Sequence, residues 1–164
     1  FVAGEQFGVA NAGYRAIESL RLEKGYRAWS SDIGPDYSPF ESGLGWAVKL
    51  KTNTPFMGRD AAQVMKDGQR TKQLVCFTVD DADVVLLGRE TIYRNGERVG
   101  WLSSGGWGYT VQKNIGYGYV RNKEGVSRDY LKSGSYELDV ATNRIACNIH
   151  FEALVDPAME RIKA

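Results

Sequence analysis

The sequence predicts an α+β protein whose character changes near residue 70. Before that point, apolar residues recur at helical spacing in two separate segments. After it, short runs of β-branched and aromatic residues are separated by glycine, which is typical of antiparallel strands. We therefore expect two units, residues 1–70 and residues 71–164, and the second should be a small antiparallel barrel or sandwich.

The first predicted element is a helix over residues 10–24, where apolar and polar residues alternate at helical spacing. Asn11 is available to cap its start, and Gly25 is the type of residue that ends a helix. Residues 30–39 are rich in Ser, Asp, Gly and Pro, which predicts a loop. Acidic residues of this loop, including Asp32, are expected to be solvated.

Two more elements complete the first unit. Residues 43–50 look like a strand, because apolar residues are frequent between two glycines and a lysine-rich end. Residues 58–66 predict a short helix that Gly68 stops. The expected boundary between the units follows directly, in residues 67–72.

The second unit begins with residues 73–79, a short apolar run of strand formers. Asn95-Gly96, between residues 90–94 and 97–102, predicts a tight hairpin with a type I′ turn, because both central positions of that turn need φ > 0. Several strands at this spacing favour antiparallel pairing.

Two later runs predict which faces are buried. Residues 115–120 place aromatic and aliphatic side chains on one face and Gly116 and Gly118 on the other, where a neighbouring backbone could approach closely. In residues 144–151, apolar and polar side chains alternate cleanly. One face of that strand is therefore expected to be buried.

Composition argues against several classes of function. The 164 residues are 43% apolar and 25% charged, as in ordinary soluble proteins, and 21 basic and 20 acidic residues give a net charge of +1. No segment gathers Lys and Arg, so no nucleic-acid or membrane partner is expected. No run is long enough to span a membrane, and the N-terminus lacks a signal-peptide layout. Cys76 and Cys147 lie in strand-like runs and predict buried thiols in a reducing compartment.

Glu23 is the residue of the chain whose chemistry points most specifically to a partner group. It ends the first predicted helix, on a face otherwise made of small and apolar residues such as Ala16, Ser19 and Leu20. An ionised carboxylate without hydrogen bonds would cost on the order of several kcal/mol there, so something must donate to it. Two explanations stay open: a salt bridge or solvated helix end, and a ligand edge with two adjacent N–H donors, such as a pterin.

Aromatic residues offer weaker indications of a ligand. Trp29 and Tyr26 could wall a flat ligand near Glu23, or fill core space between helix and sheet. Residues 103–108 are glycine-rich around Trp107 but lack the spacing and the following helix of a phosphate-binding loop. Two interpretations remain for them, the lining of a cleft and a turn whose Trp packs on the barrel.

No metal site is predicted. His150 is the one histidine, and its place on an alternating strand favours a satisfied, half-exposed residue. The acidic residues 80–83 lack the Gly and the distal Glu of a calcium loop, so solvated charge is the better interpretation.

Several stretches of this chain indicate a relationship to known proteins more specifically than its composition does. They comprise residues 14–29, 38–44, 55–61, 74–78, 92–96, 99–100, 115–119 and 131–134. Together, and in this order, they closely resemble the C-terminal folate-binding half of sarcosine and dimethylglycine dehydrogenases. That half is similar in turn to the aminomethyltransferase, or T-protein, of the glycine cleavage system.

The resemblance implies a partial folate-binding, aminomethyltransferase-like core followed by a small antiparallel β-barrel. In this family the glutamate of the Leu-Arg-Leu-Glu motif holds the pterin of tetrahydrofolate, and Glu23 is the matching residue. Leu22 and Lys24 flank the motif and are expected to touch folate. Tyr14 lies where a family tyrosine approaches the cofactor, although helical projection places it opposite Glu23. With Trp29 and Trp107, these residues form the predicted cofactor-binding set.

The resemblance also implies a function for a longer polypeptide, of which we expect this chain to be the C-terminal part. Such a protein is an FAD-dependent dehydrogenase of a small N-methyl amine, sarcosine or dimethylglycine, and tetrahydrofolate captures the one-carbon unit as 5,10-methylenetetrahydrofolate. The flavin domain and the family's catalytic aspartate have no counterpart here, so this fragment should contain no catalytic residue and be inactive alone.

Two alternatives stay open: a non-catalytic regulatory subunit similar to that of pyruvate dehydrogenase phosphatase, and a free-standing aminomethyltransferase. The expected location is the cytoplasm in bacteria and the mitochondrial matrix in eukaryotes.

Overall fold

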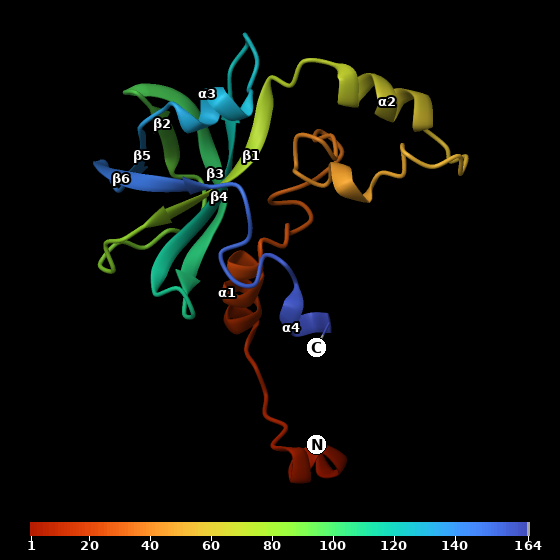
Figure 1. Cartoon of the computed structure of the whole chain (residues 1–164). Coiled ribbons are helices and arrows are strands. Elements are labelled where there is room, and N and C mark those ends of the chain that lie inside the picture. Colours follow the sequence, from red (N-terminus) through yellow and green to blue (C-terminus); the bar gives the residue numbers. More distant parts are fainter. Residues whose placement is uncertain (164) are drawn as a thin grey trace.

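A computed structural model describes residues 1–163 and combines a closed six-stranded barrel with a helical, loop-rich first part (Figure 1). This confirms the predicted α+β class. In chain order the elements are η1 (Val2–Phe7), α1 (Tyr14–Lys24), η2 (Gly45–Ala47), α2 (Arg59–Asp67), β1 (Lys72–Val79), β2 (Thr91–Arg94), β3 (Glu97–Gly108), β4 (Lys113–Arg121), α3 (Arg128–Lys132), β5 (Tyr136–Val140), β6 (Asn143–His150) and α4 (Glu160–Lys163).

The barrel is antiparallel throughout, in the order β1-β4-β3-β2-β5-β6, and pairing of β1 with β6 closes it. The hairpin between β2 and β3 turns at Asn95 and Gly96, whose φ angles of 51° and 83° confirm the predicted tight turn. The strand pattern alone allowed a barrel or a sandwich, and the family resemblance implied a barrel. The pairing of β1 with β6 shows that the sheet is a closed barrel.

Glycines on β4 make room for the barrel interior, as predicted. A Cβ atom on Gly116 would lie 2.5 Å from Cδ1 of Leu102, and one on Gly118 would lie 2.5 Å from the main-chain oxygen of Trp101. Side chains from all sides then fill the centre, where Leu102 is fully buried. Other members of this inner core are Val75, Phe77, Val79, Ile92, Val120 and Leu138.

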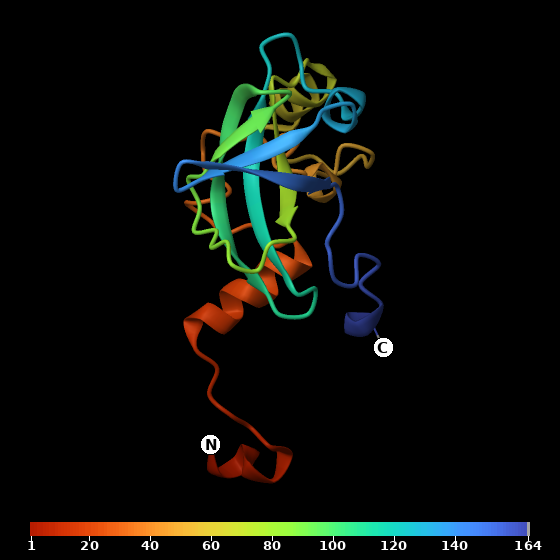
Figure 2. The ribbon, with the colours of Figure 1, turned by 90° about the vertical axis from the view of Figure 1, so that its left-hand side faces the viewer.

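Helix α1 packs on the outside of the barrel, against β3 and β4 (Figure 2). Leu22 is fully buried there, in a second apolar cluster with Cys76 of β1 and Tyr117 and Tyr119 of β4. The Tyr117 hydroxyl donates to the main-chain oxygen of Leu22 at 3.2 Å. The aromatic face predicted for residues 115–119 thus faces the helix, and the glycine face lines the barrel interior.

The structure differs from the sequence prediction at the start of α1. The helix begins at Tyr14 rather than at residue 10, and Gly13, in extended conformation, takes the N-cap position in place of Asn11. Glycine costs more than other ordinary residues to fix in a helix, which explains the later start. The predicted end is confirmed, since Gly25 has φ 72° and its N–H caps the helix.

The predicted strand over residues 43–50 is wrong. The chain there makes only the short 3-10 helix η2, and none of the strands described within residues 1–163 pairs with it. A Cβ atom on Gly45 would lie 2.7 Å from the Phe40 ring, so the segment folds onto its own preceding residues. Local strand propensity is a weak signal when no partner strand is available.

The remaining predicted elements were mostly correct. Helix α2 is found, ends before Gly68 and extends away from the barrel (Figure 1). The glycine-rich residues 103–108 belong to strand β3 and do not form a turn or loop. The missing side chain of Gly105 lets the backbone of Leu86 approach, since a Cβ atom on Gly105 would lie 2.9 Å from the Leu86 carbonyl carbon. Within residues 1–163, no helix has both the length and the apolar character that crossing a bilayer requires.

Replacing Gly118 with Ala should destabilise the barrel by about 2–3 kcal/mol, because the added methyl group would overlap the Trp101 carbonyl and the Ile92 side chain. Urea unfolding followed by circular dichroism measures the change. The control is Gly34→Ala, where no atom lies within 4 Å of the new methyl group. Equal stability of the two variants would contradict this account of the interior.

The free energy of unfolding should also fall as the pH rises above about 9. Burial raises the pKa of the Cys76 thiol from 9.0 to about 12 and that of Tyr119 from 10.0 to about 12. Because the folded state keeps these protons longer than the unfolded state does, their contribution is complete below pH 9.0 and is lost as the pH approaches 12. Urea titrations across this interval measure the loss, and Cys76→Val should show a smaller loss; a flat pH profile in the parent protein would refute the assignment.

Candidate functional site

Glu23 lies at the C-terminal end of α1 and is buried, with 2% of its surface exposed. Its partners come from the turn between β3 and β4. The Thr110 N–H donates to Oε1 at 2.5 Å, the Val111 N–H donates to the same oxygen at 3.1 Å, and the Thr110 hydroxyl donates to Oε2 at 2.7 Å. The sequence required a donor for this carboxylate, and the barrel provides three.

Glu23 is also one of the residues that line a cavity. A cavity of about 400 Å³ is lined by Glu23 and Thr110, and by the apolar side chains of Ile17, Leu20 and Tyr26. A carboxylate oxygen has about two acceptor positions, and Oε2 uses one of them here. Within residues 1–163, the second acceptor position of Oε2 has no hydrogen-bond donor. We call this space the Glu23 cavity.

Lys24 holds the C-terminal segment against the end of α1. Its Nζ lies 2.8 Å from Oδ2 of Asp156 and donates to the main-chain oxygen of Asp156 at 2.5 Å. The Val155 N–H donates to the main-chain oxygen of Glu23 at 3.0 Å. The hydrogen bond from Lys24 lowers the pKa of Asp156 below its ordinary value of 3.8. The far end of the chain thus forms one side of the Glu23 cavity.

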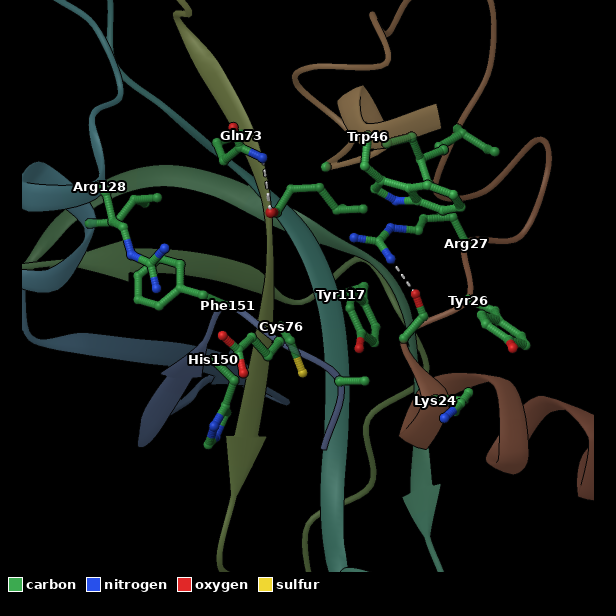
Figure 3. A pocket seen from close by; sticks show the side chains of 18 of the residues that line it. Lys24, Tyr26, Arg27, Trp46, Gln73, Cys76, Tyr117, Arg128, His150 and Phe151 are labelled. Atoms are coloured by element: carbon green, nitrogen blue, oxygen red, sulfur yellow. Dashed lines mark hydrogen bonds between the residues drawn. The ribbon is translucent and has the colours of Figure 1, made fainter. Parts of the chain in front are cut away.

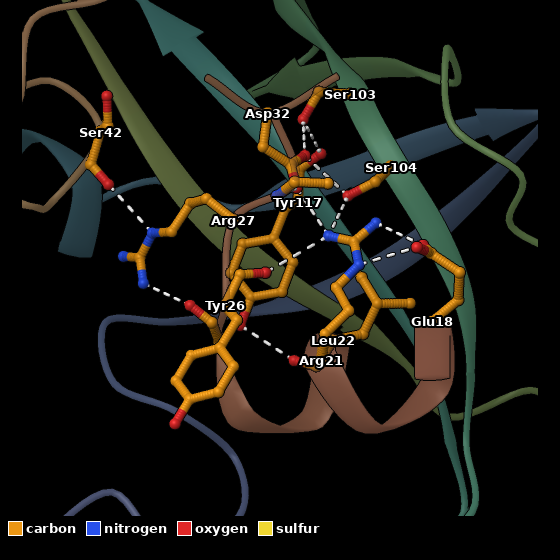
Figure 4. Close-up of polar contacts among 12 residues, drawn as sticks. Glu18, Arg21, Leu22, Tyr26, Arg27, Asp32, Ser42, Ser103, Ser104 and Tyr117 are labelled. Atoms are coloured by element: carbon orange, nitrogen blue, oxygen red, sulfur yellow. Dashed lines mark hydrogen bonds and ion pairs between the residues drawn. The ribbon is translucent and has the colours of Figure 1, made fainter. Parts of the chain in front are cut away.

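Arg21, on another face of α1, makes a buried ion-pair network (Figure 4). Its Nη1 lies 2.6 Å from Oδ2 of Asp32, and its Nε and Nη2 donate to Oε2 of Glu18 at 3.0 and 2.8 Å. Nη1 also donates to the Ser104 hydroxyl at 3.1 Å. This guanidinium joins the helix to the next loop and to β3.

Asp32 is fully buried, so the expectation of a solvated loop residue is wrong. Besides Arg21, its carboxylate accepts hydrogen bonds from the hydroxyls of Ser103 and Ser104, at 2.5 and 2.7 Å, and from the Ala28 N–H at 3.0 Å. These donors replace the water that a solvated carboxylate would bind. The loop is fixed to the barrel as a result.

A larger cavity of about 630 Å³ lies between the loop after α1, strand β1 and the C-terminal segment (Figure 3). Arg27 borders it and donates to the main-chain oxygens of Ser42, at 3.1 Å, and of Gly25. His150, also on its wall, shares a 2.8 Å hydrogen bond with the Thr78 hydroxyl, and burial lowers its pKa. Its predicted role as a satisfied strand residue is confirmed.

The predicted cofactor-binding residues do not all gather at one place. Glu23 and Lys24 both line the Glu23 cavity. Leu22 lies between them in sequence, but its side chain is fully buried in the cluster between helix and barrel. Contacts of these three residues with folate stay predictions, and for Leu22 the structure favours packing.

The aromatic candidates are scattered. Tyr14 is the first residue of α1 and is 72% exposed, and Trp29 is 70% exposed in the following loop. Trp107 borders a different cavity, of about 530 Å³, near the start of α1. Ligand roles for these three residues also stay predictions. Tyr26, considered a possible ligand wall, does line the Glu23 cavity.

Sequence reasoning missed Thr110, Asp156 and the buried role of Asp32. Thr110 and Asp156 give no local signal, because the groups they contact are separated from them by 87 and 132 residues. For Asp32, the sequence signal is the consecutive pair Ser103 and Ser104, whose hydroxyls can donate hydrogen bonds to a buried carboxylate. Among residues 1–163, no cluster of His, Cys, Asp and Glu has the arrangement of a metal site.

Replacing Arg21 with Met should lower the free energy of unfolding by about 3 kcal/mol, because it leaves the buried Asp32 carboxylate without its cation. Denaturant titration measures the change. Glu18→Gln, which alters the more exposed partner of the same guanidinium, should cost less than about 1 kcal/mol. Similar costs for both variants would contradict a special role of the Asp32 pair.

Two models of known families match the chain. The glycine cleavage T-protein C-terminal barrel domain matches residues 72–156, and the GCVT N-terminal domain matches residues 1–52. The aminomethyltransferase T of the glycine cleavage system from Bartonella henselae has a similar structure, with a TM-score of 0.70 and 25% identity over 87% of this chain and 38% of that one.

Curated relatives are longer proteins. Mitochondrial sarcosine dehydrogenase of Mus musculus is 44% identical over 98% of this chain and 18% of its own length. The pyruvate dehydrogenase phosphatase regulatory subunit of the same organism is 36% identical over 86% of this chain and 17% of its length. Mus musculus dimethylglycine dehydrogenase is 39% identical over 72% of this chain and 14% of its own length. The chain thus spans less than a fifth of these relatives, and it belongs to the glycine cleavage T-protein family.

Proposed function

We propose that the chain forms one wall of a tetrahydrofolate site in a longer, FAD-dependent dehydrogenase of sarcosine or dimethylglycine. The single observation that carries the proposal is the buried Glu23 carboxylate beside an apolar cavity. The identities of 44% and 39% to sarcosine and dimethylglycine dehydrogenases support the choice of substrate class.

The residues of the Glu23 cavity fit a pterin in chemistry. The remaining acceptor position on Oε2 of Glu23 suits an N–H donor of an aminopyrimidine edge, and a charged acceptor strengthens such a bond. Ile17, Leu20 and Tyr26 offer the apolar surface that a flat ring requires. The three hydrogen bonds from Thr110 and Val111 hold the carboxylate in place before any ligand arrives, so little ordering would be needed on binding.

Within this proposal the chain binds and orients, and performs no redox chemistry. Tetrahydrofolate supplies the acceptor of the one-carbon unit when it is bound, and FAD belongs to a part of the dehydrogenase outside residues 1–164. Glu23 fixes the position of the ring edge. Lys24 acts one step away, because its ion pair with Asp156 positions the C-terminal segment on the cavity wall.

Replacing Glu23 with Gln in the complete dehydrogenase should weaken reduced-folate binding by about tenfold or more, the typical cost of a lost charge-assisted hydrogen bond. Gln is nearly isosteric, and its oxygen can still accept the N–H groups of Thr110 and Val111. Isothermal titration with tetrahydrofolate measures affinity. Amine-dependent reduction of the flavin should remain within about twofold, because the substitution lies outside the flavin domain.

The matched control is Thr110→Val, which removes the hydroxyl donor to Glu23 and keeps the carboxylate charge. Its folate affinity should stay within about threefold of the parent value. Unchanged affinity in Glu23→Gln, with flavin reduction intact, would defeat the assignment. Equal losses in both variants would show that the turn, and not the carboxylate charge, determines binding.

A second candidate function is a non-catalytic regulatory subunit, which the 36% identity to the pyruvate dehydrogenase phosphatase regulatory subunit favours. A free-standing aminomethyltransferase is the third candidate, supported by 36% identity to the enzyme of Bacteroides thetaiotaomicron over 74% of this chain. Flavin content and amine oxidation by the complete protein distinguish the first candidate from these two.

Two further points belong to the proposal. The mitochondrial names of the sarcosine and dimethylglycine dehydrogenase relatives support the matrix as the location in a eukaryote, with the cytoplasm for a bacterial protein. The division into residues 1–70 and 71–164 stays a prediction; the two matched family models end and begin at residues 52 and 72.

A further inference from the structure

We propose that a basic groove on the outside of the barrel binds an acidic peptide segment of a partner protein. The groove has a volume of about 580 Å³ and lies where β1 begins and β4 ends, beside β3. Lys72, Arg98, Arg121 and Lys123 provide its charge, and Trp101 its largest apolar surface. None of these residues lines the Glu23 cavity, so the inference is independent of the proposed folate site.

Positive charge in this groove is local and largely unpaired. The part of its lining that residues 1–163 provide contains the four cations and no carboxylate, although the whole chain has a net charge of only +1. Among the described residues 1–163, Lys72 alone of the four is in an ion pair, a long one of 3.9 Å to Glu41. Arg98 and Lys123 are therefore available to carboxylates of a partner, and Arg121, whose Nη1 donates to the main-chain oxygen of Tyr119 at 3.1 Å, has further N–H groups to offer.

A stack of aromatic rings and cations holds part of the groove in place. The Arg121 guanidinium lies 3.9 Å from the centre of the Trp101 ring and 5.8 Å from that of Tyr119. Tyr119 stacks on Tyr37 at 4.1 Å, and Nζ of Lys72 lies 4.7 Å from the Tyr37 ring. Side chains that are already ordered lose less conformational entropy when a partner binds.

The composition of the groove favours a peptide as its occupant. Trp, Tyr and Arg are enriched among the residues that contribute most to protein–protein binding, and the guanidinium group matches a carboxylate in two parallel hydrogen bonds. Trp101 is 43% exposed, so an apolar side chain between two acidic ones could cover its free surface.

Fluorescence anisotropy with a labelled peptide of alternating Glu and Leu tests the proposal on the complete protein. We expect binding at low ionic strength that weakens by at least about tenfold between about 50 and 300 mM salt, because the charges are exposed and screened. A peptide of alternating Lys and Leu should not bind. The double variant Arg98→Glu and Lys123→Glu, at two exposed positions, should weaken acidic-peptide binding by about tenfold or more.

The matched control is Lys66→Glu with Lys132→Glu, which makes the same change in charge at exposed positions of α2 and α3 outside the groove. It should leave binding within about twofold, and circular dichroism verifies folding of both variants. Equal weakening by the control, or binding unaffected by the groove variant, would overturn the proposal. So would tight binding of an oligothymidylate with none of the acidic peptide, since that result would assign the groove to nucleic acid.

Discussion

The buried pair of Arg21 and Asp32 fixes the geometry on which the candidate site depends. Asp32 is fully buried, and its carboxylate is satisfied only when the loop, helix α1 and strand β3 meet in one arrangement. A displaced helix would leave a charge inside the protein without partners, which is far costlier than the loss of an apolar contact. The pair thus acts as a constraint on position more than as a source of stability.

Glu23 follows Arg21 by two residues and benefits from the same constraint. Once α1 is fixed against the barrel, the Glu23 carboxylate meets the turn after β3, where Thr110 and Val111 donate to it. Its pairing with the barrel and its position on the wall of a cavity are compatible, because a carboxylate has more acceptor positions than the turn uses. A residue can thus be structurally satisfied and still be available to a ligand.

Local signals in the sequence predicted much of the barrel. Asn95-Gly96 sufficed for the hairpin because its turn type depends on φ angles that few residues adopt, and the alternation of residues 144–151 sufficed for β6. The segment 43–50 shows the opposite case, where strand-like residues had no neighbouring strand to pair with. The strand pattern alone also left closure of the barrel open, since closure depends on pairing between the first and last strands; the family resemblance correctly implied the barrel.

At the candidate site, the sequence predicted that a buried carboxylate requires a hydrogen-bond donor but could not predict which residue provides it. Glu23 required a donor on chemical grounds, but Thr110 lies 87 residues further along the chain. Separations of 71 and 72 residues likewise hide the serines that donate to Asp32. Family likeness identified Glu23 and Lys24, which do share a cavity, but it also identified Tyr14, which is exposed. Trp29, chosen by its spacing from Glu23, is exposed as well.

Pairing of β1 with β6 has a consequence for how the protein behaves in concentrated solution. Each of the six strands is paired on both sides over at least part of its length, so within residues 1–163 no barrel strand has one edge unpaired from end to end. Open sheets commonly need lysines, prolines or bulges to discourage growth into fibrils. A closed barrel opposes such growth through its topology, and the outer faces of its strands can then carry charged and aromatic side chains for other purposes.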